Sequence, residues 1–139
     1  MPMMDAYIAN IVEEYIYSNV RETNEEGYII EYRTKYGEKD GEYKIWFSNG
    51  QLSLQTTYID GKLDGEYTEW YEDGQLATQT TYVDHKLHGE YKRWYKNGKL
   101  FKQIFYLNDK RHGEYKEWWE NGQLWHQVNF VNGELQNRI

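Results

Sequence analysis

Cysteine is absent from this chain of 139 residues. That absence excludes a disulfide framework and any metal site built from thiolates. No apolar run approaches the roughly 20 residues that cross a membrane. The opening residues, MPMMDAYIAN, have neither a basic n-region nor an apolar h-region, so we expect no signal peptide and a cytoplasmic protein.

Hydrophobicity is low, yet aromatic residues are plentiful. The mean hydropathy is -1.03 and 28% of residues are charged, which would suggest weak burial. Aromatic residues make up 18% of the chain, however, and disordered chains are poor in them. A single or rolled sheet with a large surface reconciles the two facts. The net charge is -7 and no strong basic excess is present, so we do not expect nucleic acid as a partner.

A repeat occupies most of the chain. Gly41, Gly65, Gly89 and Gly113 stand 24 residues apart, and each opens a similar phrase: GEYKIWFSNGQL, GEYTEWYEDGQL, GEYKRWYKNGKL and GEYKEWWENGQL. A fixed period is typical of arrays in which each unit buries its face against its neighbours. We divide the array, residues 28–139, into a partial repeat at 28–40 and full repeats at 41–64, 65–88, 89–112 and 113–136.

Each repeat contains two turn signals. One is an Asn-Gly or Asp-Gly pair such as Asn49-Gly50, and the other is Asp60-Gly61 with its equivalents. We interpret the first as a type I′ turn and both as two-residue loops, which join antiparallel strands. The array is therefore predicted to be a mainly β fold, an elongated antiparallel meander of about ten strands. In this register Trp46 lies opposite Ser53, and Lys96 lies opposite Lys99.

The even period places equivalent side chains on the same face. One face is predicted to be a floor of tyrosine, leucine and other apolar residues, including Leu52 and Trp119. The other face is predicted to be polar except for one column of tryptophans, Trp46, Trp70, Trp94 and Trp118, with Ser53, Ala77, Phe101 and Trp125 opposite them.

The segment before the array has a different pattern. Apolar residues between Ile8 and Ile16 recur at helical spacing, and Asp5 is a suitable N-cap. We therefore predict an α-helix over residues 5–20 followed by a polar linker over 21–27, so that residues 1–27 form a separate unit. This helix could pack against its own chain or against a second copy.

The repeat phrase resembles that of the MORN-repeat variant family. The pattern Y-x-D-G-K-x-x-G-x-Y-x-x-W-Y-x-x-G-x-L is found at Tyr58–Leu76 and, with departures, at Tyr82–Leu100 and Tyr106–Leu124. The departures are His85 and Asp109 in place of glycine, and Arg111 in place of leucine. The resemblance implies β-hairpin units in an elongated, twisted sheet. It also implies a non-enzymatic role as a scaffold, a protein-interaction or lipid-associated module, or a bacterial antitoxin.

Metal binding and catalysis have little support in the sequence. His88 and His112 occupy equivalent positions, but two strands separate them by roughly 9–10 Å, too far for both to reach one zinc ion at about 2 Å. The same spacing argues against a calcium cage built from Glu42, Glu66, Glu90 and Glu114. No phosphate loop, nucleophile elbow or catalytic triad is evident. We expect no cofactor, no metal and no enzymatic activity.

Two groups of residues near the C-terminus are the candidate partner-binding site. The first is a set of aromatic residues, which either cover the sheet or form an exposed apolar patch: Trp94, Phe101, Phe105, Trp118 and Trp125. The second is a set of basic residues that either extend into water or meet an acidic partner: Arg93, Lys96, Lys99 and Lys102.

We therefore predict a non-enzymatic protein-protein interaction module, antitoxin-like or scaffolding, whose partner is another protein, with an acidic surface as one candidate. Two alternatives remain. The chain could be a structural component of a viral or cellular particle that self-associates through the N-terminal helix or its last edge strand. It could also associate peripherally with anionic lipid through the basic third repeat.

Overall fold

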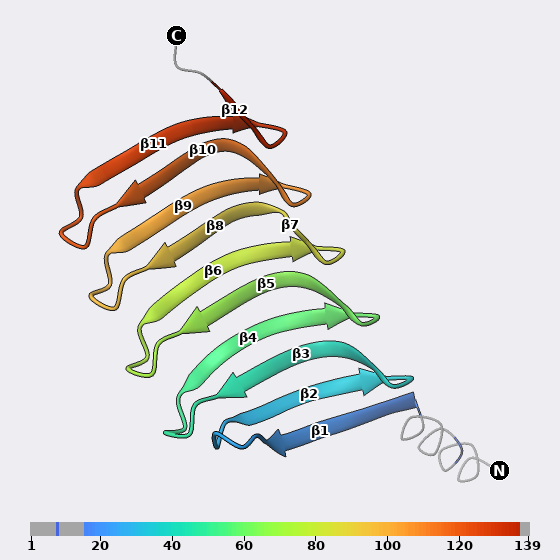
Figure 1. Ribbon diagram of the computed structural model, residues 1–139. Coiled ribbons are helices and arrows are strands. Elements are labelled where there is room, and N and C mark those ends of the chain that lie inside the picture. The colour runs from blue at the N-terminus through green and yellow to red at the C-terminus, as the bar shows by residue number, and fades with distance from the viewer. Residues whose placement is uncertain (1–7, 9–15, 137–139) are drawn as a thin grey trace.

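The computed structural model describes Ile8 and residues 16–136. Residues 17–136 form one sheet of twelve strands, and the chain meanders from one end of the sheet to the other (Figure 1). Neighbours along the chain pair antiparallel, except that the short strand 86–87 and the strand 89–94 both pair with the strand 76–83. The predicted β-meander of hairpin repeats is confirmed. Its strands are β1 (Tyr17–Thr23), β2 (Ile29–Lys35), β3 (Glu38–Trp46), β4 (Leu52–Ile59), β5 (Lys62–Trp70), β6 (Leu76–Val83), β7 (Lys86–Leu87), β8 (Gly89–Trp94), β9 (Leu100–Leu107), β10 (Lys110–Trp118), β11 (Leu124–Val131) and β12 (Glu134–Gln136).

The sheet begins earlier in the chain than predicted. Tyr17–Thr23 is strand β1, and it pairs with β2 along its whole length. The predicted helix over residues 5–20 is therefore wrong from Tyr17 onward, and so is the linker at 21–23. The segment YSNVRET is mostly polar with β-branched residues at Val20 and Thr23, which suits an exposed edge strand once β2 is available to pair with it. The rest of the helix prediction, residues 5–7 and 9–15, lies outside the described residues.

The two kinds of hairpin turn differ in conformation. At Asp60-Gly61 both residues have positive φ, 45° and 78°, as a type I′ turn requires. His85 adopts φ 68° and Asp109 φ 67° at the glycine position, so the departures from glycine do not change this turn. The predicted register at this end is confirmed, with Ile59 opposite Lys62.

The Asn-Gly turns are not type I′, and that prediction is wrong. Only Gly50 has positive φ, and its N–H donates to the carbonyl of Phe47 at 2.9 Å. The N–H of Phe47 donates to the carbonyl of Gln51 at 2.8 Å, which closes a loop of three residues, 48–50. The Asn49 side chain accepts a hydrogen bond from the N–H of Gln51 at 2.9 Å, a local interaction that favours this wider loop.

A β-bulge beside each wide turn absorbs the added residue. Ile45 pairs with Leu54 and Trp46 pairs with Leu52, so Ser53 is the extra residue of its strand. Trp46 therefore lies opposite Leu52 and not opposite Ser53 as predicted. The same correction applies in the other repeats, where the extra residues are Ala77, Phe101 and Trp125.

One face of the sheet carries the aromatic rings and is called here the tyrosine face. Its repeating unit is an edge-to-face pair of rings, with centroids 5.5 Å apart for Tyr43 and Tyr58 and 5.7 Å apart for Tyr67 and Tyr82. Later copies are Tyr91 with Tyr106 and Tyr115 with Phe130. Such pairs stabilise by about 0.5–1.5 kcal/mol each beyond their buried area. The sheet is a single layer, so among the described residues only Ala77 and Ile104 are buried apolar side chains.

The hairpin tips at the Asp-Gly edge are hydrogen-bonded to neighbouring arms. The carboxylate of Asp64 accepts the N–H of Asp84 at 3.0 Å, and the equivalent His112 Nδ1 accepts the N–H of Asn132 at 3.4 Å. His88 occupies the same position in the repeat 65–88. Its Nδ1 and the nearby Thr80 hydroxyl are buried without a hydrogen-bond partner in the described part of the chain. Hydrogen bonding is therefore least complete, within the described sheet, where β6 meets β8.

We expect the substitution His88→Asp to stabilise the protein. A carboxylate at this position would accept the N–H of Asn108, as Asp64 does for Asp84. A net gain of about 1 kcal/mol is the usual contribution of such a bond. Urea denaturation would measure it, with His112→Asp as the control because His112 already accepts a bond. An unchanged or lower free energy of unfolding for His88→Asp would contradict this account.

Candidate functional site

The structure divides the predicted site residues between the two faces. The Arg93 guanidinium and the Lys102 ammonium both lie over the Phe101 ring, at 5.9 and 5.2 Å, on the tyrosine face. Strand alternation directs Trp94 and Trp118 to the opposite face, which is called here the charged face. Phe105 also lies there, where it lines a hollow together with Glu90, Gln103 and Lys116.

Lys96 and Lys99 are separated by the wide turn and do not face each other as predicted. Lys96 lies in the loop, 5.9 Å from the Tyr71 ring, whereas the backbone of Lys99 pairs with that of Tyr95. The Lys99 ammonium donates to the carbonyl of Asn121 at 2.9 Å. These two lysines therefore attach this turn to its neighbours.

A ring cluster lies at the C-terminal end of the tyrosine face. The Trp119 and Trp125 indoles are 5.2 Å apart, and the Trp125 indole lies 5.3 Å from the imidazole of His126. His126 in turn meets Tyr115 edge-to-face at 5.7 Å. We call Trp119, Trp125 and His126 the indole cluster. Trp125 reaches this face because it is the extra residue of the bulge in β11.

The indole cluster is exposed because the last repeat departs from its predecessors. The Tyr71 hydroxyl donates to the carbonyl of Trp94 at 2.6 Å, and the Tyr95 hydroxyl donates to the carbonyl of Trp118 at 2.7 Å. Each of these two tyrosine rings is thereby held against the next hairpin of the array. Trp119 occupies the same position but has no hydroxyl, and it is 53% exposed, while Trp125 is 49% exposed.

Trp119 was missed as a site residue because the sequence argument assigned it to the buried floor. The signal that could have found it is the change from Phe47, Tyr71 and Tyr95 to tryptophan at the last equivalent position. Sequence alone does not show whether a further full-length strand covers Trp119. In the described chain, β12 pairs only with Asn129–Val131 of β11, at the other end of that strand.

A row of charged side chains leads from the third repeat to the indole cluster. Arg93 lies directly opposite Lys102, as predicted, and Lys102 lies opposite Glu117, which lies opposite His126. Lys102 and Glu117 form an ion pair at 2.8 Å, and the Tyr115 hydroxyl donates to Glu117 at 2.6 Å. An acidic residue of the same chain therefore already pairs with Lys102.

Hydrogen bonding outweighs burial at this ion pair. Burial alone would raise the pKa of Glu117, but the bonds from Lys102 and Tyr115 favour the carboxylate and leave the pKa lower than its ordinary value. Burial would lower the pKa of Lys102, whereas the bonds to Glu117 and Tyr115 raise it. Both side chains are thus held charged at neutral pH.

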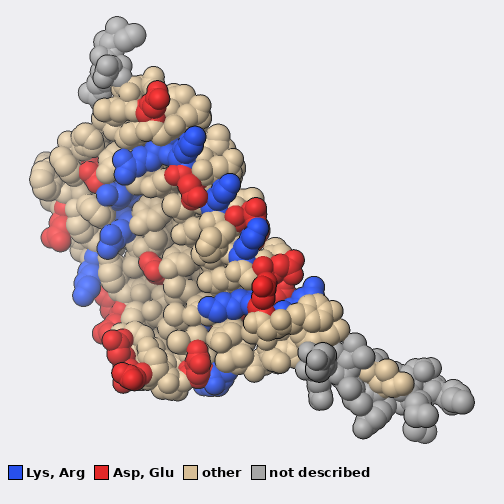
Figure 2. Space-filling model, turned by 45° about the vertical axis from the view of Figure 1, so that its right-hand side comes forward, with Lys and Arg blue, Asp and Glu red and all other residues tan. Residues whose placement is uncertain are grey.

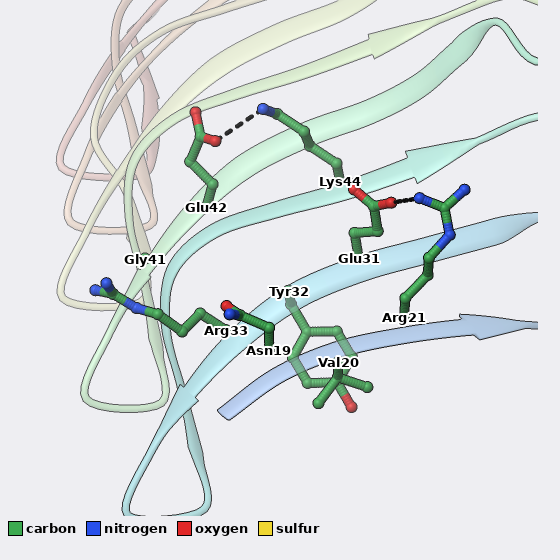
Figure 3. Close-up of a pocket in the computed structure, with 9 residues that line it drawn as sticks. All are labelled: Asn19, Val20, Arg21, Glu31, Tyr32, Arg33, Gly41, Glu42 and Lys44. Carbon is green, nitrogen blue, oxygen red and sulfur yellow. Dashed lines mark hydrogen bonds and ion pairs between the residues drawn. The ribbon is translucent and has the colours of Figure 1, made fainter. Parts of the chain in front are cut away.

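The charged face holds open hollows lined by polar and charged side chains. One of them, with a volume of about 640 Å³, lies over β1, β2 and β3. Two ion pairs border it, Arg21 with Glu31 and Lys44 with Glu42, and their side chains are drawn in Figure 3. Acidic and basic side chains are interspersed over the surface shown in Figure 2. This mutual neutralisation leaves little attraction for a ligand of one charge sign.

The repeats match a known family. The family profile described as "MORN repeat variant" matches four consecutive segments, residues 39–60, 63–84, 87–108 and 111–132. The chain belongs to the MORN-repeat variant family. MORN repeats are generally protein- or membrane-binding modules, and this membership suggests a protein-interaction role. No curated protein matches the chain in a sequence search.

Two further findings concern the part of this MORN-repeat chain that the structure describes. Its helical residues include no segment of the length and apolar character needed to cross a membrane. Within the same residues, no group of three or more histidine, aspartate and glutamate side chains has the arrangement of a metal site.

Proposed function

We propose that this MORN-repeat chain is a non-enzymatic protein-interaction module, antitoxin-like or scaffolding, and that the indole cluster is where a partner protein docks. The observation that supports this proposal is the pair of tilted, half-exposed indoles at the end of an array in which the hydroxyls of Tyr71 and Tyr95 anchor the equivalent rings. Tryptophan is among the residues that contribute most to the affinity of protein interfaces.

The surroundings of the cluster suit an interface. The Trp119 and Trp125 indoles are 53% and 49% exposed, so that their apolar surface is open to solvent at the last hairpin. Charged and hydrogen-bonding side chains of β8 to β10 border it. An apolar centre with a polar rim is typical of protein interfaces. The rings are also held by one another, which reduces the entropy lost when a partner binds.

The experiment compares proteins captured from the native source by the wild-type chain and by a Trp119→Ser/Trp125→Ser double variant. We expect a protein recovered by the wild type in stoichiometric amount and reduced at least tenfold with the double variant, because truncating interface hot spots costs about 2 kcal/mol or more. The control is Phe105→Ser, which removes an aromatic residue of similar exposure, 48%, from the charged face. Circular dichroism would establish that all three chains are folded.

Other outcomes would contradict the proposal. Equal recovery of the captured protein by the Trp119→Ser/Trp125→Ser variant and by Phe105→Ser would show that the indole cluster does not bind it. Flotation of the wild-type chain with anionic liposomes, lost in Lys96→Gln/Lys99→Gln, would favour lipid association. Light scattering that shows ordered self-assembly without any captured protein would favour a structural role in a particle.

A further inference from the structure

One residue of the tyrosine face departs from its repeat in a way that the fold does not require. Arg93 occupies the position held by Ile45, Glu69 and Glu117 in the other repeats. The Tyr67 hydroxyl donates to Glu69 at 2.7 Å, and the Tyr115 hydroxyl donates to Glu117 at 2.6 Å. A guanidinium has no acceptor, so Arg93 cannot receive the same bond from Tyr91.

Arg93 also carries an electrostatic cost within the sheet. Its cross-strand neighbours are Lys102 on one side and Thr78 on the other. Like charges directly opposite each other are destabilising. Lys102 has Glu117 as its partner, but no carboxylate of the described residues lies within ion-pair distance of Arg93. A glutamate here would satisfy Tyr91 and pair with Lys102, so arginine is the less stable choice.

The surroundings of Arg93 suit the binding of a carboxylate. The side chain is exposed, and its guanidinium lies 5.9 Å from the Phe101 ring, which orients one face of the group and leaves its donors accessible. Phe101 is itself held 4.9 Å from Tyr95. A planar guanidinium fixed in this way can bind a carboxylate through two parallel hydrogen bonds.

We propose that Arg93 binds an aspartate or glutamate of a protein segment whose apolar side chain packs on the indole cluster. This inference rests on the proposed protein-binding function. From Arg93 on β8 to His126 on β11 there are three strand steps, or about 14 Å. Four residues of an extended segment cover about 13 Å. The partner segment therefore carries its acidic residue about four positions from its apolar residue.

The charge of the surroundings favours an acidic residue over other anchors. Lys96 lies in the wide turn that follows β8. The one acidic side chain in the row from Arg93 to His126 is Glu117, which is already paired with Lys102. From Arg93 toward the indole cluster the excess charge is therefore positive. Adjacent Lys92 is different, because it points to the charged face and pairs with Glu90 at 2.6 Å. Lys92 thus offers a matched control on the same strand.

The test uses a phage-displayed library of random linear peptides selected on the wild-type protein. We expect the selected peptides to contain aspartate or glutamate about four residues from an aromatic or aliphatic residue. For a synthetic copy of one such peptide, Arg93→Gln should weaken the dissociation constant about tenfold, in line with the loss of a charged hydrogen bond. Lys92→Gln should change it less than twofold.

Charge reversal provides the decisive comparison. Arg93→Glu should abolish binding of the acidic peptide, and a peptide with lysine in place of the acid should recover binding to that variant. The melting temperature of Arg93→Glu should equal or exceed that of the wild type, which separates lost binding from lost folding. Peptides that lose affinity in the Trp119→Ser/Trp125→Ser variant but not in Arg93→Gln would overturn this inference alone. Selection of no peptide, or of peptides indifferent to both variants, would overturn the proposed function and this inference with it.

Discussion

Replacing Ile104 with alanine is expected to lower the free energy of unfolding by about 3 kcal/mol. Ile104 is only 4% exposed, although the sheet has a single layer. It lies in β9 with Tyr91 of β8 and Tyr115 of β10 as its register partners, so that rings from both neighbours cover it. Truncation would leave a cavity that the flanking rings fill only in part, because their own pairs hold them in place.

Urea denaturation followed by tryptophan fluorescence measures this loss, and Val128→Ala is the control. Val128 is the equivalent residue of the last hairpin and is half-exposed, so its truncation should cost less than 1 kcal/mol. Hydrogen exchange should show faster opening of β8 to β10 in Ile104→Ala than of β3 and β4, because each repeat contacts only its neighbours. If Ile104→Ala lowered the free energy of unfolding by less than 1 kcal/mol, packing around Ile104 on the tyrosine face would not act as a hydrophobic core.

The second large effect is expected from Glu117→Ala, a loss of about 2 kcal/mol at neutral pH. Glu117 is 8% exposed and receives hydrogen bonds from Lys102 and from Tyr115. Its removal would leave the half-buried Lys102 beside Arg93 with no carboxylate in contact. Removing one member of a buried pair costs about 3–5 kcal/mol, and the partial exposure of Lys102 reduces this figure. Glu114→Ala is the control, because Glu114 also pairs with a lysine, Lys116, but its own side chain is 62% exposed, so its loss should change stability little.

The effect of Glu117→Ala should depend on pH in one direction. The pKa of Glu117 in the folded protein is below its ordinary value of 4.5, because the bonds from Lys102 and Tyr115 outweigh the effect of burial. A carboxyl with a lowered folded pKa stabilises the protein above its unfolded pKa, and this stabilisation is lost as the pH falls through the folded value. The difference in stability between wild type and variant should therefore be constant from pH 7 to about pH 5.5 and shrink below pH 4.5. A difference that grows on acidification would contradict the assignment of the ion pair.

Only part of the candidate site could be predicted from the sequence: Trp125, Arg93 and Lys102 were predicted, whereas Trp119 and His126 of the indole cluster were not. The sequence correctly placed Arg93 opposite Lys102, because the bulge at Phe101 offsets the additional residue of the wide turn and leaves the pairing beyond it unchanged. It placed Trp125 beside Trp118 on the wrong face. The reason is local: an Asn-Gly pair is compatible with both a two-residue and a three-residue hairpin loop, and the side chain of the asparagine decides which one forms.

The sequence by itself determined the architecture of this protein. A 24-residue period with two turns per unit permits little other than stacked hairpins, since only neighbouring copies can bury the recurring tyrosines. Tertiary structure decided three other features: the bulge that brings Trp125 to Trp119, the pairing of Lys102 with Glu117, and the recruitment of Tyr17–Thr23 into a strand. Each depends on a neighbouring strand for its hydrogen bonds or its charge. The pattern along a single strand carries no information about that neighbour.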